Sequence, residues 1–114
     1  MLEYQFLITE QDIQQYAEIS GDDNPIHLDE GLAKHHGFSG KVAHGMLTMV
    51  SVWRILSIHL LTSTDFPNDY ELDFHTPVYA GDMVILQVKH TANRLRIEGH
   101  CKGKLVVKGW MIIA

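Results

Sequence analysis

Residues 44–61 read HGMLTMVSVWRILSIHLL and are apolar on nearly every side of a helix. A helix on a protein surface shows a polar stripe, whereas this stretch has only isolated polar side chains, at positions 48, 51, 54, 57 and 59. A helix that is apolar all round is normally buried along most of its length. We therefore expect one long helix that the rest of the chain encloses.

The chain after this helix changes to the alternating pattern of β-strands. A polar loop is expected over residues 62–69, and no helical segment separates the strands that follow, so they should be antiparallel neighbours. One buried helix and several such strands predict an α+β domain in which a curved sheet wraps around a long central helix. The expected strands are residues 2–8, 70–74, 83–90, 95–101 and 105–113, with turns at 92–93 and 102–103.

Length and charge bound the class of protein. The chain has 114 residues, which fits a single domain over residues 1–114. Its formal net charge of -5 argues against a nucleic-acid-binding protein. Basic residues gather near the C-terminus, where they fit either a site for an anionic ligand or the solvent face of strands. With one cysteine, Cys101, no signal peptide and no membrane span, the sequence predicts a cytoplasmic protein without a membrane partner.

Residues 20–29, SGDDNPIHLD, are too rich in Gly, Asp, Asn and Pro for a regular helix or strand, so an irregular loop is expected there. Pro25 restricts this loop and makes it stiff. Asp22 and His27 can converge on one small molecule and act as an acid–base pair. The alternative is that Asp22 binds turn amides and His27 caps the next helix. Asn24 either holds this pair or only forms the turn.

The start of the long helix is the second candidate site. First-turn N–H groups have no intrahelical acceptor and lie at the positive end of the helix dipole. Gly45 leaves room for a ligand to approach them, and its N–H can stabilise a developing oxyanion. His44 and Met46 flank it and are predicted substrate contacts. The alternative is a helix start without a ligand.

The remaining histidines show no metal-ligand spacing, so neither a metal nor a cofactor is expected. Cys101 stands within a strand with no His near it in the sequence, which favours a buried, unreactive thiol.

Two stretches, YAEISGDDNPIHLD (residues 16–29) and AHGM (residues 43–46), resemble the MaoC-like, R-specific enoyl-CoA hydratases of the hot-dog fold. The pattern Phe74, Pro77-Val78 and Gly81-Asp82 is similar to the family's later strand signature. The resemblance implies a homodimer that reversibly hydrates trans-2-enoyl thioesters to R-3-hydroxyacyl thioesters. It also implies that coenzyme A or phosphopantetheine is part of the substrate rather than a cofactor.

Carried over by position, the resemblance makes Asp22 and His27 the pair that activates water and protonates the α carbon. Asn24 falls on the family's motif asparagine, and Gly45 on the backbone donor to the thioester carbonyl. The sequence departs from the family at Asp73, where a basic residue is common, and at Trp53, where a small polar residue is common. Trp53 is therefore a predicted substrate contact that shortens the acyl pocket.

Three other functions remain open on these residues. A dehydratase of acyl-carrier-protein substrates would use the same chemistry with a different thioester handle. A hot-dog thioesterase tends to carry an acid on the central helix, and residues 44–61 contain neither Asp nor Glu. A non-catalytic acyl-binding domain would tolerate loss of the acid–base pair, and here the pair is intact.

Overall fold

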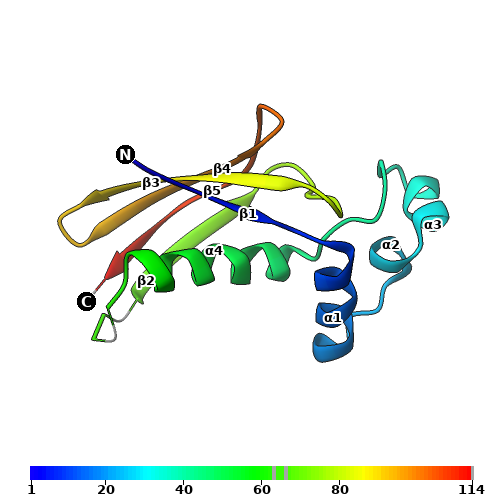
Figure 1. Cartoon of the computed structure of the whole chain (residues 1–114), viewed down its shortest axis with the longest axis horizontal. Helices are drawn as coiled ribbons and strands as arrows, with labels where there is room; N and C mark the ends of the chain where they lie inside the picture. Colours follow the sequence, from blue (N-terminus) through cyan, green and yellow to red (C-terminus); the bar gives the residue numbers. More distant parts are fainter. Residues whose placement is uncertain (63, 66, 114) are drawn as a thin grey trace.

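The computed structural model describes residues 1–62, 64, 65 and 67–113. In this part of the chain a five-stranded sheet lies over one long helix, and three shorter helices gather beyond the N-terminal end of that helix (Figure 1). The helices are α1 (Glu10–Ser20), α2 (Pro25–Leu28), α3 (Glu30–His35) and α4 (Gly45–His59), and the strands are β1 (Leu2–Leu7), β2 (Pro67–Phe74), β3 (Met83–Thr91), β4 (Arg94–Cys101) and β5 (Lys104–Ile113).

All strand pairs are antiparallel, as predicted, and the order across the sheet is β1-β3-β4-β5-β2. The expectation that consecutive strands are neighbours holds for β3, β4 and β5 but is wrong for β2, which crosses to pair with β5. The predicted loop over residues 62–69 is also too long, because β2 begins at Pro67. Proline is acceptable as the first residue of an edge strand, where its missing N–H breaks no inner ladder.

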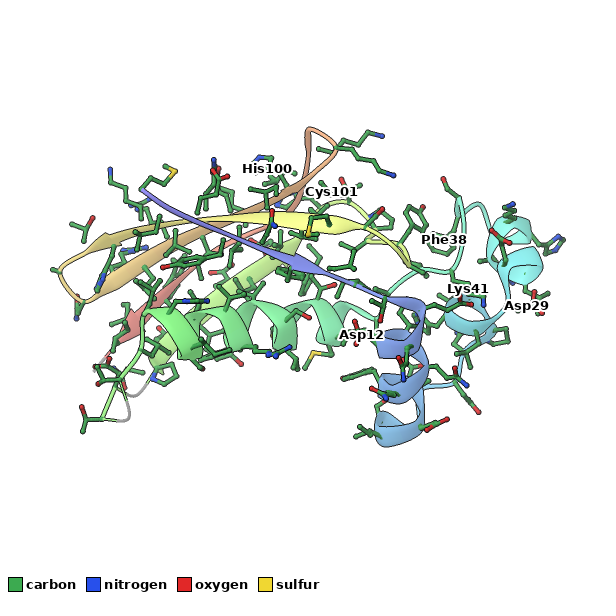
Figure 2. The ribbon with its side chains drawn as sticks, in the orientation of Figure 1. Asp12, Asp29, Phe38, Lys41, His100 and Cys101 are labelled. Atoms are coloured by element: carbon green, nitrogen blue, oxygen red, sulfur yellow. The ribbon has the colours of Figure 1, made fainter. Side chains whose placement is uncertain are left out.

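Local capping explains where the helices begin and end. Thr9 and Asp12 form a complete capping box at the start of α1, and Gly21 ends that helix with φ 78°. Asp29 caps α3 through a 2.9 Å bond from the Leu32 N–H. Figure 2 shows Asp12 and Asp29 at the starts of these two helices.

The predicted irregular loop is only partly irregular, because Pro25–Leu28 forms one turn of helix, α2. Pro25 is its first residue, a position at which the missing N–H has no intrahelical partner to lose. The Asn24 side chain caps this turn by accepting from the Ile26 N–H at 3.1 Å.

α4 confirms the predicted long helix but not its burial on every side. Leu47, Thr48, Val52 and Leu56 are buried against the sheet. Each fully buried aliphatic side chain of this size stabilises the fold by about 1.5–3 kcal/mol. The opposite side of α4 is exposed in the single chain, including three large apolar side chains, Met46, Val50 and Ile58.

β4 has one buried face, formed by Leu95, Ile97 and Cys101. Burial raises the pKa of the Cys101 thiol, and the nearby Asp82 carboxylate raises it further. Figure 2 shows Cys101 beside the sheet with its neighbour His100 on the other face. The predicted inert cysteine fits this environment. No described helix has the length and apolar content needed to cross a membrane.

The basic residues near the C-terminus lie on β-strands and their turns, and two of them lie beside acidic partners. Lys102 Nζ lies 3.5 Å from Asp82, and Lys108 Nζ lies 3.8 Å from Glu98. The Arg94 guanidinium stacks 5.1 Å over the Trp110 ring. These contacts favour the view that the basic residues decorate the solvent side of the sheet.

Candidate active site

The loop between α1 and α2 presents the predicted acid. Gly21 turns the chain out of α1, and Asp22 follows with its side chain 54% exposed. The Asn24 N–H points to Asp22 Oδ1 at 3.4 Å, so the turn itself orients the carboxylate. Asn24 therefore stabilises the loop in two ways: its backbone N–H orients the Asp22 carboxylate, and its side chain caps α2.

His27 is buried on α2, and its ring orientation is fixed from outside the loop. Its Nδ1 lies 2.6 Å from the carbonyl oxygen of Val42. A carbonyl oxygen only accepts, so Nδ1 carries the proton and Nε2 carries the lone pair. This Nε2 lies 3.8 Å from Asp22 Oδ2, which is longer than a hydrogen bond. Both basic atoms are thus directed to the same place, available to an incoming molecule.

His44 connects this pair to the start of α4. Its Nε2 donates to the backbone carbonyl of Asp22 at 2.9 Å. Its ring stacks on His27, with centroids 3.7 Å apart and 20° between the planes. On the other side Tyr16 packs against it at 4.8 Å. His44 is 3% exposed, so it forms a buried link between the two predicted parts of the site.

Gly45 is the first residue of α4, and no side chain caps the start of this helix. It borders a cavity of about 290 Å³. The first-turn N–H groups of α4 are therefore next to a space that a ligand can enter. The residues lining the cavity are Val42, Ala43, Gly45, Thr48, Phe74, His75, Thr76, Pro77 and Val78.

Four predicted residues, Asp22, His27, His44 and Gly45, are thus brought together. Met46 is 52% exposed, and Trp53 packs edge-to-face on Tyr70 at 5.3 Å. Neither lines the cavity beside Gly45, and the buried His44 does not line it either, so the substrate contacts predicted for all three stay predictions.

A second hollow of about 540 Å³ lies against the other flank of the loop and is lined by Asp23, among others. It is larger than the cavity beside Gly45, and neither Asp22 nor His27 lines either of the two hollows. We place the site at the smaller cavity because Gly45 lines it, and because Val42, whose carbonyl oxygen lies 2.6 Å from His27 Nδ1, lines it too.

Asp22, His27 and His44 also offer ligand atoms within 4.8 Å of one another, the separation expected of a metal site. Their orientation fits one poorly. The two imidazole rings are stacked with nearly parallel planes, so their in-plane lone pairs do not converge on a single ion. The arrangement suits proton transfer better than metal coordination.

Two contributors to the site were missed from the sequence. Val42 acts through its backbone carbonyl, which leaves no trace in residue identity. Thr48 is buried one turn after Gly45 and lines the cavity. A small polar residue on an apolar helix, one turn after a candidate oxyanion donor, was the available signal for Thr48.

Comparison with known proteins shows the family to which the chain belongs. Residues 2–110 match the family model of the MaoC like domain. The chain is 36% identical over 106 residues to a mitochondrial 3-hydroxyacyl-acyl-carrier-protein dehydratase of Arabidopsis thaliana, covering 90% of this chain and 57% of that protein. It is 34% identical over 84 residues to an (R)-specific enoyl-CoA hydratase of Rhodospirillum rubrum, covering 74% and 58%. The chain spans about half the length of the curated relatives it matches.

Solved structures confirm the predicted hot-dog fold. The R-hydratase PhaJ1 of Pseudomonas aeruginosa superimposes with a TM-score of 0.80 at 35% identity, covering 98% of this chain and 77% of that one. The (R)-hydratase of A. caviae gives a TM-score of 0.85 at 24% identity, covering 98% and 91%, and supports the fold alone. From its sequence match and its architecture, the chain belongs to the MaoC-like dehydratase family.

Proposed function

We propose that this protein is a hydro-lyase, an R-specific enoyl-CoA hydratase that reversibly adds water to trans-2-enoyl thioesters. One observation carries the proposal: Asp22 Oδ2 and His27 Nε2 lie 3.8 Å apart, and His44 links their loop to the first turn of α4. An acid–base pair and an oxyanion donor are what hydration of a conjugated thioester requires.

In the proposed reaction, water lies between the Asp22 carboxylate and His27 Nε2. The pair takes one proton from the water as its oxygen bonds to Cβ, and returns a proton to Cα, so that one water is added across the double bond. Negative charge develops on the thioester oxygen, where the Gly45 N–H stabilises it. Acid–base groups of this kind contribute about 10²–10⁴-fold, and one oxyanion donor about 10²–10³-fold.

The second candidate is the dehydration of 3-hydroxyacyl chains on acyl carrier protein. The Arabidopsis relative carries that name, and the chemistry runs through the same atoms in reverse. A thioesterase is disfavoured because α4 has no carboxylate between Gly45 and His59. A non-catalytic acyl-binding role is disfavoured because Asp22 and His27 are both present and directed to one place.

Three accompanying proposals concern the state of the protein. A homodimer is supported by the exposed apolar side of α4, with Met46, Val50 and Ile58, and by the two open sheet edges at β1 and β2. A cytoplasmic location fits its single, unpaired thiol, Cys101. We propose no cofactor and no metal, with the coenzyme A or phosphopantetheine group belonging to the substrate.

The function is tested by mixing the purified protein with crotonyl-CoA and following the absorbance of the conjugated thioester. We expect the absorbance to fall and chiral analysis to return R-3-hydroxybutyryl-CoA. The kcat/KM is then measured for the crotonyl group on acyl carrier protein. The higher of the two kcat/KM values shows whether coenzyme A or acyl carrier protein is the preferred carrier of the acyl chain. A protein that hydrates neither substrate, or that releases free crotonate, would refute the assignment.

A Gly45→Ala variant tests whether Gly45 is needed for substrate to approach the helix start rather than for folding. A Cβ at this position meets the Phe74 ring at 4.0 Å, an ordinary contact, so folding should be undisturbed. The free energy of unfolding should stay level or rise by up to about 1 kcal/mol, since Ala is the better helix former. Turnover should fall about 10-fold, because the methyl group crowds the substrate at an oxyanion donor. Parallel losses of stability and activity would contradict this separation.

A further inference from the structure

His44 has a feature that simple packing does not explain. Its Nδ1 is fully buried and has no hydrogen-bond partner among the described residues. A buried polar atom without a partner is destabilising, and an apolar ring of the same size would avoid that cost. The imidazole at position 44 must therefore supply something that a phenyl ring does not.

Among the described residues, only its other nitrogen has a hydrogen-bond partner. Nε2–H donates to the Asp22 carbonyl, 22 residues earlier in the chain, at 2.9 Å. This bond holds the backbone of the residue that carries the proposed catalytic carboxylate. The stacked His44 ring covers one face of His27 at 3.7 Å, which restricts rotation of the second catalytic side chain.

His44 also belongs to the start of α4. Its own carbonyl accepts from the Leu47 and Thr48 N–H groups, 3.1 and 3.2 Å away, and it directly precedes Gly45. The same residue thus contacts the acid, the base and the helix turn that provides the oxyanion donor. Its side chain and backbone therefore set the distance between the Asp22–His27 pair and the Gly45 N–H.

We propose that His44 is a positioning residue that holds Asp22 and His27 at the correct distance from the Gly45 N–H. This inference rests on the proposed hydratase function. It does so as a neutral imidazole with the proton on Nε2. His27 is held in the opposite form, with its proton on Nδ1, by the Val42 carbonyl. Two stacked imidazoles of opposite tautomer leave the catalytic lone pair of His27 facing Asp22.

Kinetics of two variants test the role. His44→Phe keeps a stacked ring but removes the donor to the Asp22 carbonyl, whereas His44→Gln restores an N–H of similar reach. We expect kcat to fall about 100-fold in His44→Phe, since a misplacement of about 1 Å has that effect, and to recover to within about 10-fold of wild type in His44→Gln. The KM should change less than about 3-fold in both, because the proposal gives His44 a role toward the catalytic groups in place of the substrate contact expected from the sequence.

The matched control is His59→Phe. His59 also lies on α4 and also stacks, on Tyr4 at 4.7 Å, but is at the opposite end of the helix from Gly45. Its kcat should match wild type. The melting temperatures of His44→Phe and His59→Phe should both stay within about 5 °C of wild type. Full activity in His44→Phe, or a loss that Gln does not rescue, would overturn the proposal.

Nitrogen-15 NMR of the wild-type imidazoles gives a readout that does not depend on turnover. We expect a bare Nδ1 and protonated Nε2 in His44, and the reverse in His27. An Nδ1–H tautomer in His44 would overturn the positioning role even in an active enzyme. Conversely, a wild type that hydrates neither thioester refutes the proposed function, while the NMR result still decides whether His44 binds the Asp22 carbonyl as described.

Discussion

Asp22→Asn and His27→Ala should each lower kcat/KM for crotonyl-CoA by at least about 100-fold, the low end of typical acid–base contributions. The amide of Asn cannot accept a proton as the carboxylate does, and Ala removes the Nε2 lone pair that lies 3.8 Å from Asp22. Because the two groups act on one water, their effects should not add. The double variant should be only slightly worse than either single variant.

Asp23→Asn is the control for this pair. Asp23 is the adjacent carboxylate, is exposed, and borders the hollow on the other flank of the loop. The substitution changes net charge in the same way as Asp22→Asn, so its kcat/KM should remain within about 3-fold of wild type. Equal losses in both Asp variants would point to a general charge effect and against a specific role for Asp22. Full activity in either Asp22→Asn or His27→Ala would refute the acid–base assignment.

Gly109→Ala should lower the free energy of unfolding by about 3 kcal/mol or more, at the upper end of overpacking effects. Gly109 pairs with Leu72 across the β2–β5 ladder. A Cβ there would lie 2.0 Å from the Glu71 carbonyl oxygen and 2.7 Å from Leu72 Cδ2. The nearest atom is backbone, so the edge strand β2 must move. Urea unfolding curves would report the change as a lower midpoint.

Gly40→Ala is the matched control for that substitution. A Cβ at Gly40 has Glu30 Oε1 at 3.9 Å as its nearest neighbour, an ordinary contact. Its unfolding midpoint should change little, by less than about 1 kcal/mol in free energy. A Gly109→Ala protein as stable as Gly40→Ala would show that β2 does not pair with β5 in the described register.

β2 also matters for function, because it ends at Phe74, which lines the cavity beside Gly45. A shift of β2 should therefore reduce activity as well as stability in Gly109→Ala. This coupling distinguishes it from Gly45→Ala, for which activity should fall while stability is kept.

Local chemistry made much of the fold predictable. The capping box at Thr9, the left-handed Gly21 and the turn at Lys102-Gly103 each depend on a few adjacent residues, and the turn was predicted from the sequence. The helix α4 was also predicted, but not the exposure of one side of it. Apolar composition indicates that a surface is covered, without saying whether the same chain or another covers it.

Contacts between distant residues were not predictable in the same way. β2 passes its sequence neighbour β3 and pairs with β5, because the alternating pattern of a strand fixes which side is buried and not which strand lies beside it. The one-turn helix α2 was missed because Pro, Asn and Asp also favour irregular turns.

For the site, the sequence by itself determined which residues are candidates for the chemistry: Asp22, Asn24 and His27 in one loop, and Gly45 at a helix start. Only the tertiary structure decided how they meet. The Val42 carbonyl selects the tautomer of His27 from 15 residues away, and His44 reaches the Asp22 carbonyl across 22 residues. A hydrogen bond needs a separation near 3 Å and a defined direction, and both depend on the path of the whole chain.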